Sequence, residues 1–155
     1  MHRAVDAYTD SHPEWRKSRN RLSPGRRRYA GIIVDVFYDH FLARNWETFS
    51  SNGDSLDEFV ARCHADLRKR RDVTPPEVLP IFKRMADEDW LGSYLEMEGI
   101  AQALNRISLR SPVLGPVRGS IVELERNYAG IEADFLAFYP DLIAYAATLR
   151  DERRL

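Results

Sequence analysis

Residues 32–42 read IIVDVFYDHFL, and eight of these eleven side chains are apolar or aromatic. A helix that is apolar nearly all round is a buried helix, so we expect this stretch to be the central element of the fold. At least some of the other three side chains, Asp35, Asp39 and His40, must then be at least partly removed from water. Buried carboxylates persist only when they are paired, hydrogen-bonded or bound to a metal. The run therefore predicts a helical core with a cation beside it.

Helical periodicity dominates the rest of the chain, and no stretch alternates with the two-residue period of a strand. We predict an all-α fold, a single-domain helical bundle over residues 1–155. Ser11 is the expected N-cap of the second helix, Ser55 and Glu58 form a capping-box pattern, and Pro140 is expected to restart the last helix. After a short helix that ends near residue 9, the expected helices cover about 13–22, 26–46, 55–71, 76–88, 90–108, 117–138 and 140–150.

Composition narrows the class of protein. The chain has 155 residues, of which 44% are hydrophobic, and its net charge of −1 argues against a strongly basic nucleic-acid binder. The single cysteine, Cys63, favours a reducing compartment. No apolar run approaches the roughly 20 residues of a membrane span, and the start lacks the pattern of a signal peptide. We therefore expect a cytoplasmic protein with neither a membrane nor a nucleic acid as its partner.

The three polar residues of the central run have a spacing that suits a metal. Asp35 and Asp39 are four residues apart and share a helix face, and His40 lies beside Asp39. Two like charges on one face favour a divalent cation. Two alternatives stay open: His40 could be a neutral core histidine that donates to a backbone carbonyl, and the two acids could pair with arginines of the second helix.

A second set, His2, Asp6 and Asp10, repeats the fourfold spacing near the start of the chain. An ordinary amphipathic helix with a wet polar face explains this pattern equally well. In combination, however, two helices would each supply carboxylate or imidazole ligands to one site. That mixture suits Mn²⁺, Mg²⁺ or Fe²⁺ better than a structural zinc site.

The third feature is a basic run within thirteen residues. It consists of Arg16, Lys17, Arg19, Arg21, Arg26, Arg27 and Arg28. Its only acidic neighbours in the sequence are Asp10 and Glu14, so we expect it to be nearly unopposed. Guanidinium groups there could hold a phosphate or steer an acidic protein, although a solvated helix face needs no function. Aromatic residues that could stack on bases are largely missing from this run, so we expect an acidic protein as its partner in preference to a nucleic acid.

Two stretches carry a resemblance to a known family: residues 2–13, which read HRAVDAYTDSHP, and residues 35–46, which read DVFYDHFLARNW. Weaker matches follow at Trp90-Leu91 with Tyr94, at Gly99-Ile100, and at residues 104–108 and 135–140. Together they cover essentially the whole chain, which resembles the bacterial acyl carrier protein phosphodiesterases. Members of that family usually open with a further segment, and Met1 aligns with an interior position. We therefore expect the chain to be truncated at its N-terminus relative to the family.

The resemblance implies an all-α enzyme, distantly related to the HD phosphohydrolases, that acts in fatty acid and lipid metabolism. Such an enzyme removes 4′-phosphopantetheine from holo acyl carrier protein with a divalent metal, typically manganese. The metal ligands are then His2, Asp6, Asp39 and His40, and the catalytic residues are Asp39, His40 and Asp35. The residues expected to bind the acidic carrier protein are Arg3, Arg16, Lys17, Arg19, Arg26, Arg27 and Arg28. The alternatives are a non-catalytic helical module that binds the carrier protein and a nucleotide phosphohydrolase.

Overall fold

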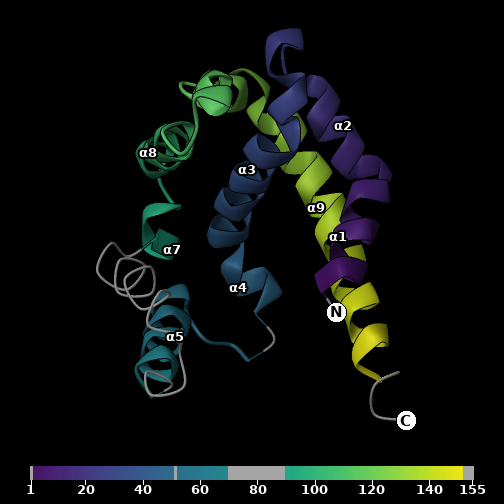
Figure 1. Ribbon diagram of the computed structural model, residues 1–155. Helices are drawn as coiled ribbons and strands as arrows, with labels where there is room; N and C mark the ends of the chain where they lie inside the picture. Colours follow the sequence, from purple (N-terminus) through teal and green to yellow (C-terminus); the bar gives the residue numbers. More distant parts are fainter. Residues whose placement is uncertain (1, 51, 70–89, 152–155) are drawn as a thin grey trace. The chain divides into compact units, whose positions relative to one another are not determined.

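The computed structural model describes residues 2–50, 52–69 and 90–151, and the expected break at residues 74–76 and helix at 76–88 lie outside these ranges. All regular elements in the described ranges are helices, so the predicted all-α class is confirmed. None of the described helices is long and apolar enough to cross a bilayer. The chain divides into two compact units, one formed by Met1–Tyr38 with Ala103–Leu155 and the other by Asp39–Gln102 (Figure 1).

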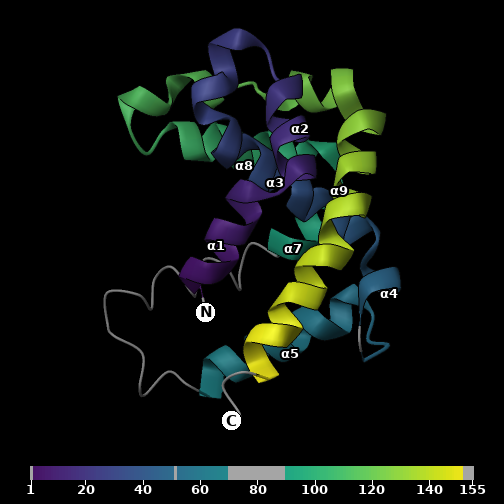
Figure 2. The same cartoon turned by 90° about the vertical axis from the view of Figure 1, so that its right-hand side faces the viewer.

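The first unit is built around three helices that lie side by side, α1, α2 and α9 (Figures 1 and 2). Two 3₁₀ segments, η1 and η3, also pack on each other in this unit. α3 begins here and α8 ends here. The bounds are α1 (His2–Ser11), α2 (Pro13–Arg21), η1 (Pro24–Tyr29), α3 (Ala30–Arg44), α8 (Met97–Ser108), η3 (Pro112–Val117) and α9 (Ile121–Asp151).

Aromatic side chains from α2, α3 and α9 form the core of this unit. The Tyr38 ring centroid lies 5.2 Å from that of Trp15 and 5.2 Å from that of Phe135, both in edge-on contacts. Phe37 of the central run is fully buried, as is Ile33. The prediction that residues 32–42 form a largely buried helix is confirmed, because most of the apolar side chains in the run are removed from water.

The second unit contains the end of α3, the start of α8 and three further helices. These are α4 (Trp46–Phe49), α5 (Leu56–Lys69) and α7 (Trp90–Ser93). Ala43 and Leu56 form a small buried cluster in this unit, with Trp46, Tyr94 and Leu95 packed against them.

The capping box that begins α5 is confirmed. The Ser55 N–H donates to Glu58 Oε2 at 2.8 Å, and the Glu58 N–H donates to Ser55 Oγ at 3.2 Å. This motif could be read from the sequence because both partners lie within one helical turn.

The expected N-cap of α2 was wrong. His12, not Ser11, is the cap: its Nδ1 accepts the Glu14 N–H at 3.3 Å, and Pro13 occupies the first helical position as expected. Ser11 instead donates its hydroxyl to the carbonyl of Tyr8 at 2.8 Å and so closes the end of α1. A serine beside a helix boundary can bond to either side of it, and here the preceding helix takes the bond.

Several expected helix boundaries were also wrong, including the one at residue 117, since α9 begins at Ile121. The helix expected at 26–46 begins at Ala30, because residues 24–29 form the tighter turns of η1, and it ends at Arg44. The helix expected at 90–108 is split into α7 and α8. The break expected at Pro140 is absent: α9 passes through it, and the one residue with non-helical angles is Asn127. Pro140 has no N–H to donate to the carbonyl of Leu136, four residues earlier in the helix. Leu136 is exposed, so water can donate to this carbonyl instead.

Candidate functional site

Three carboxylates of the first unit, Asp6, Asp10 and Asp35, form an acidic group. Asp6 and Asp10 come from α1 and Asp35 from α3, and all three residues are exposed. Partial desolvation, together with the negative charges of Asp10 and Asp6, raises the pKa of Asp35 from 3.8 to about 6. The structure therefore brings together acids from the two stretches that the sequence singled out.

No arginine neutralises Asp35 in the part of the chain that the structure describes. The alternative in which Asp35 belongs to a structural ion-pair network with the second helix is therefore wrong. Because its neighbours are like charges, the group carries unbalanced negative charge on a surface that water and ions can reach. A group of like charges of this kind attracts cations from solution.

His40 and Asp39 belong to the second unit. Asp39 is exposed, whereas the His40 ring is fully buried and its Nδ1 lies 2.7 Å from the carbonyl oxygen of Tyr94. Because a carbonyl oxygen only accepts, Nδ1 carries a proton and donates it to the carbonyl of Tyr94. The bond is the one expected of a core histidine, and it is also the bond that orients metal-binding histidines. In either case Nε2 is the nitrogen that a metal would take.

The four predicted metal ligands are divided between the two units. Asp6 lies in the first unit and Asp39 and His40 in the second, while the side chain of His2 is outside the described part. Among the side chains that the structure does describe, no group of three or more His, Cys, Asp and Glu residues is arranged to hold a metal. The ligand set therefore stays a prediction.

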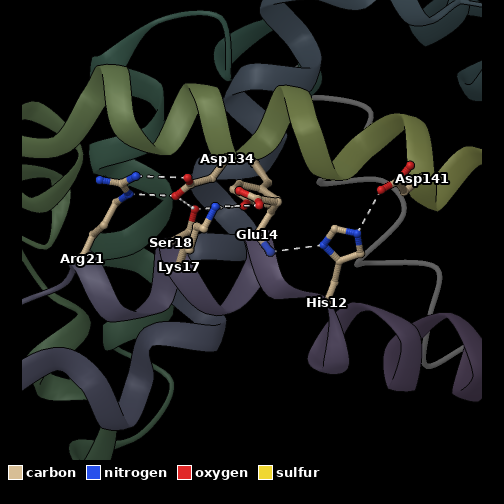
Figure 3. Close-up of polar contacts among 8 residues, drawn as sticks. His12, Glu14, Lys17, Ser18, Arg21, Asp134 and Asp141 are labelled. Carbon is tan, nitrogen blue, oxygen red and sulfur yellow. Dashed lines mark hydrogen bonds and ion pairs between the residues drawn. The ribbon is translucent and has the colours of Figure 1, made fainter.

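The basic run is less free than its sequence suggests. Arg21 donates from Nε and Nη2 to both carboxylate oxygens of Asp134, at 2.8 and 3.1 Å (Figure 3). Arg26 pairs with Glu123 at 3.1 Å. Lys17 pairs with Glu14 at 2.7 Å. The expectation that the run is nearly unopposed was wrong, because α9 supplies acids that lie far away in the sequence.

Sequence reasoning missed Asp134 and Glu123, although a signal was present. Asp134 lies three residues after Ile131 and beside Phe135, so it falls on the buried stripe of α9. Both acids are almost fully buried, at 3% and 0% exposure. A carboxylate within a buried stripe needs a cationic partner, and the basic run was the obvious source. Ser23 also donates its hydroxyl to Glu123, and the pKa of Glu123 is lowered by these hydrogen bonds against the opposing effect of burial.

The remaining residues of the expected partner-binding set are accessible. Arg3, Arg27 and Arg28 are exposed, and Arg19 is half-buried. Arg16 is exposed as well, and its Nε donates to the carbonyl of Asp10 at 3.1 Å.

Two contacts hold α1, which carries Asp6 and Asp10, against α9. The Tyr8 and Tyr145 rings stack with centroids 4.2 Å apart. His12 Nε2 lies 3.3 Å from the Asp141 carboxylate (Figure 3). Since His12 Nδ1 accepts from a backbone N–H, Nε2 carries the proton and donates to Asp141. These contacts position the acids of α1 relative to α3.

The fold and this group of acids define an all-α protein whose first unit carries both exposed acids and exposed arginines. The chain belongs to the acyl carrier protein phosphodiesterase family, whose model matches residues 1–142, which confirms the resemblance. It is 37% identical over 147 residues to the acyl carrier protein phosphodiesterase of Salmonella dublin, covering 95% of this chain and 76% of that protein. The proteins of the same name from Enterobacter sp. (strain 638) and Escherichia coli O157:H7 are 35% identical, over 94% and 95% of this chain and 75% and 76% of their own length. No solved structure matches.

Proposed function

We propose that this protein hydrolyses the phosphodiester bond that joins 4′-phosphopantetheine to holo acyl carrier protein. Water adds at phosphorus, 4′-phosphopantetheine is released, and the serine hydroxyl of the apo carrier protein is restored. The observation that carries the proposal is the meeting of Asp35 with Asp6 and Asp10, in a chain that matches relatives of this name over 95% of its length. The reaction would belong to lipid metabolism, and the single cysteine, Cys63, favours the cytoplasm as its location.

The proposed cofactor is a divalent cation, with Mn²⁺ preferred over Mg²⁺ and Fe²⁺. Its proposed ligands are Asp6, Asp39, His40 and His2, and Asp35 either binds it or orients a ligand. When bound, the cation supplies a Lewis acid that offsets negative charge on the phosphoryl oxygens. The raised pKa of Asp35 supports this site, because a cation would relieve the crowding of like charges that contributes to it.

The chain's own residues have two further tasks. His40 is held by its hydrogen bond to the Tyr94 carbonyl, so its ring keeps one orientation while a ligand binds to Nε2. Arg3 lies three residues before Asp6 on α1 and is exposed, which places both side chains on the same side of the helix. Its guanidinium can hold two phosphoryl oxygens at once, a geometry that suits a phosphodiester.

The test is the release of 4′-phosphopantetheine from holo carrier protein with added Mn²⁺. Asp39→Asn and Asp35→Asn are expected to lower kcat/KM by about 100-fold or more, since both act directly at the proposed metal site. Asp57→Asn is the matched control, because Asp57 is an exposed acid in the first turn of α5 and has no proposed role. Equal rates for Asp39→Ala, His40→Ala and the wild type, with circular dichroism showing that all are folded, would remove the assignment.

Two other outcomes separate the alternatives. A protein that binds apo and holo carrier protein but retains no stoichiometric metal and releases no product is a binding module. A protein that hydrolyses free nucleotides and leaves holo carrier protein intact is a nucleotide phosphohydrolase. Either result would overturn the proposal, and metal content measured on the purified protein accompanies both assays.

A further inference from the structure

Two segments without a single acidic residue meet in the first unit. No Asp or Glu occurs between Glu14 and Asp35 or between Glu98 and Glu123. The first segment contains η1 and the second contains η3, and these two pack against each other (Figure 2). The Nε of Arg26 donates to the carbonyl of Pro116 at 3.1 Å and joins them. Their meeting concentrates positive charge that neither segment shows alone.

Four exposed arginines lie on η1 or on either side of η3. Arg27 and Arg28 lie on η1, Arg110 precedes η3, and Arg118 follows it. No carboxylate pairs with any of the four in the described ranges. They differ in this from Arg26, whose charge is already matched by the buried Glu123. The available positive charge of the first unit therefore extends beyond α2, to η1 and η3.

Two exposed apolar residues belong to the same segment as Arg110 and Arg118. Leu109 is 76% exposed and Val113 is 58% exposed, the two highest values among the large hydrophobic residues of the described ranges. The segment that carries them is well held, since Asn105 Oδ1 accepts the Gly119 N–H at 3.0 Å and the Leu114 N–H donates to the Ser111 carbonyl at 3.0 Å. Exposed apolar side chains on a fixed backbone, in a segment that also carries exposed arginines, are typical of a contact surface.

We propose that this surface is where the protein docks an acidic protein, with the apolar pair at the centre of the contact and the arginines around it. We name it the η1–η3 face; its residues are Arg27, Arg28, Leu109, Arg110, Val113 and Arg118. The inference rests on the proposed function, under which the acidic partner is the carrier protein. The arginines steer the encounter and the apolar pair is desolvated on contact.

The chemistry of the η1–η3 face favours a folded protein over an anionic membrane. A helix that binds a lipid surface buries a broad apolar face, whereas Leu109 and Val113 are only two side chains. The face also shifts the expected contact away from α2, where Lys17 and Arg21 are occupied by Glu14 and Asp134.

The experiment measures binding of apo carrier protein, and separately kcat and KM with holo carrier protein, by the full chain. The variants are Arg27→Gln with Arg110→Gln, and Leu109→Gln alone. The expected result for each is a dissociation constant and a KM at least about fivefold higher, which corresponds to about 1 kcal/mol, with kcat unchanged. Added salt is expected to reduce the difference in dissociation constant between the wild type and the double arginine variant, but not that between the wild type and Leu109→Gln.

The controls carry the same chemical changes elsewhere. Arg44→Gln removes an exposed positive charge at the end of α3, and Leu136→Gln removes an exposed leucine from α9. Both are expected to bind as the wild type does. Loss of binding in the controls equal to that in the face variants would overturn the proposal, because the effect would then be one of overall charge or hydrophobicity. Wild-type binding by the face variants would overturn it as well.

Failure of the docking surface and failure of the proposed function are distinguishable. A wild type that binds apo carrier protein through the η1–η3 face but releases no 4′-phosphopantetheine removes the function and keeps the surface. If the wild type releases 4′-phosphopantetheine and the face variants bind and turn over normally, the proposed function stands and the docking surface is removed. Vesicles containing phosphatidylglycerol serve as the membrane probe. If these vesicles bind the wild type but not the face variants, while the face variants bind carrier protein as the wild type does, the partner is a lipid surface and the proposal is wrong.

Discussion

Replacing Asp134 with alanine is expected to cause a large loss of stability, because its carboxylate ties α2 to α9 inside the first unit. Asp134 accepts the Ser18 hydroxyl at 2.9 Å and two N–H groups of Arg21, at 2.8 and 3.1 Å. Ser18 in turn lies 2.9 Å from the Tyr38 hydroxyl. Asp134→Ala removes three acceptor contacts at once and leaves the guanidinium without its partner.

The size of the effect follows from the burial of the two partners. The Asp134 side chain is 4% exposed and that of Arg21 is 37% exposed. Breaking a fully buried pair costs about 3–5 kcal/mol, but water can reach the guanidinium that Asp134→Ala would leave behind. The buried Ser18 hydroxyl also keeps Tyr38 as a partner. We therefore expect the free energy of unfolding to fall by about 3 kcal/mol, at the lower end of that range.

Urea denaturation followed by tryptophan fluorescence measures this loss, since Trp15 is buried in the same unit beside Tyr38. In a thermal melt the expected decrease in Tm is roughly 6–12 °C for a chain of this size. Lys17→Ala is the matched control on α2: its ion pair with Glu14 is exposed, with the lysine side chain 59% accessible. The control should lose about 0.5 kcal/mol or less. Equal losses for Asp134→Ala and Lys17→Ala would refute the reasoning that burial sets the strength of the Asp134 pair.

Three further substitutions have expected outcomes. The pKa of Asp35 is about 6 in the folded protein, above its ordinary value of 3.8. Between these two pH values the folded state binds more protons than the unfolded state, so the wild type loses stability as pH rises from about 4 to 6. Asp35→Asn should therefore raise Tm at pH 8 in EDTA and leave it unchanged near pH 3. A higher wild-type Tm at pH 8 would contradict this. A Cβ at Gly99 would overlap the backbone of Ser93, so Gly99→Ala should cost about 1–3 kcal/mol in urea denaturation, and a neutral result would count against this close approach. Ser55→Ala removes the acceptor of the Glu58 N–H and should lower stability by about 1 kcal/mol, with Ser55→Asp as the variant expected to retain the cap.

Several features could be predicted from the sequence because their causes are local. The apolar run at residues 32–42 has few polar positions, so any packing of the helix must bury most of it, and Phe37 and His40 are indeed fully buried. The capping box needs only Ser55 and Glu58, three residues apart in the first turn of the helix. Asp6 and Asp10 share a helix side because of the helical repeat.

Other features depended on which elements pack together. Ile32 belongs to the apolar run yet is 38% exposed, because the helix presents that position away from its neighbours. The start of α2 was set by a histidine, His12, whose second nitrogen donates to Asp141 on a helix far along the chain. Propensity and spacing within a few residues contain no information about such contacts.

The sequence by itself determined that this protein is helical, that acids and a histidine lie on the faces of two helices, and that positive charge is concentrated in residues 16–28. Only the tertiary structure decided which charges remain available. Arg21 is matched by Asp134, 113 residues away, and Arg26 by Glu123, 97 residues away, whereas Arg27 is not paired in the described ranges. The physical reason is that helical periodicity acts over a few residues of one chain segment, while the pairing of charges depends on packing between segments that the periodicity does not specify.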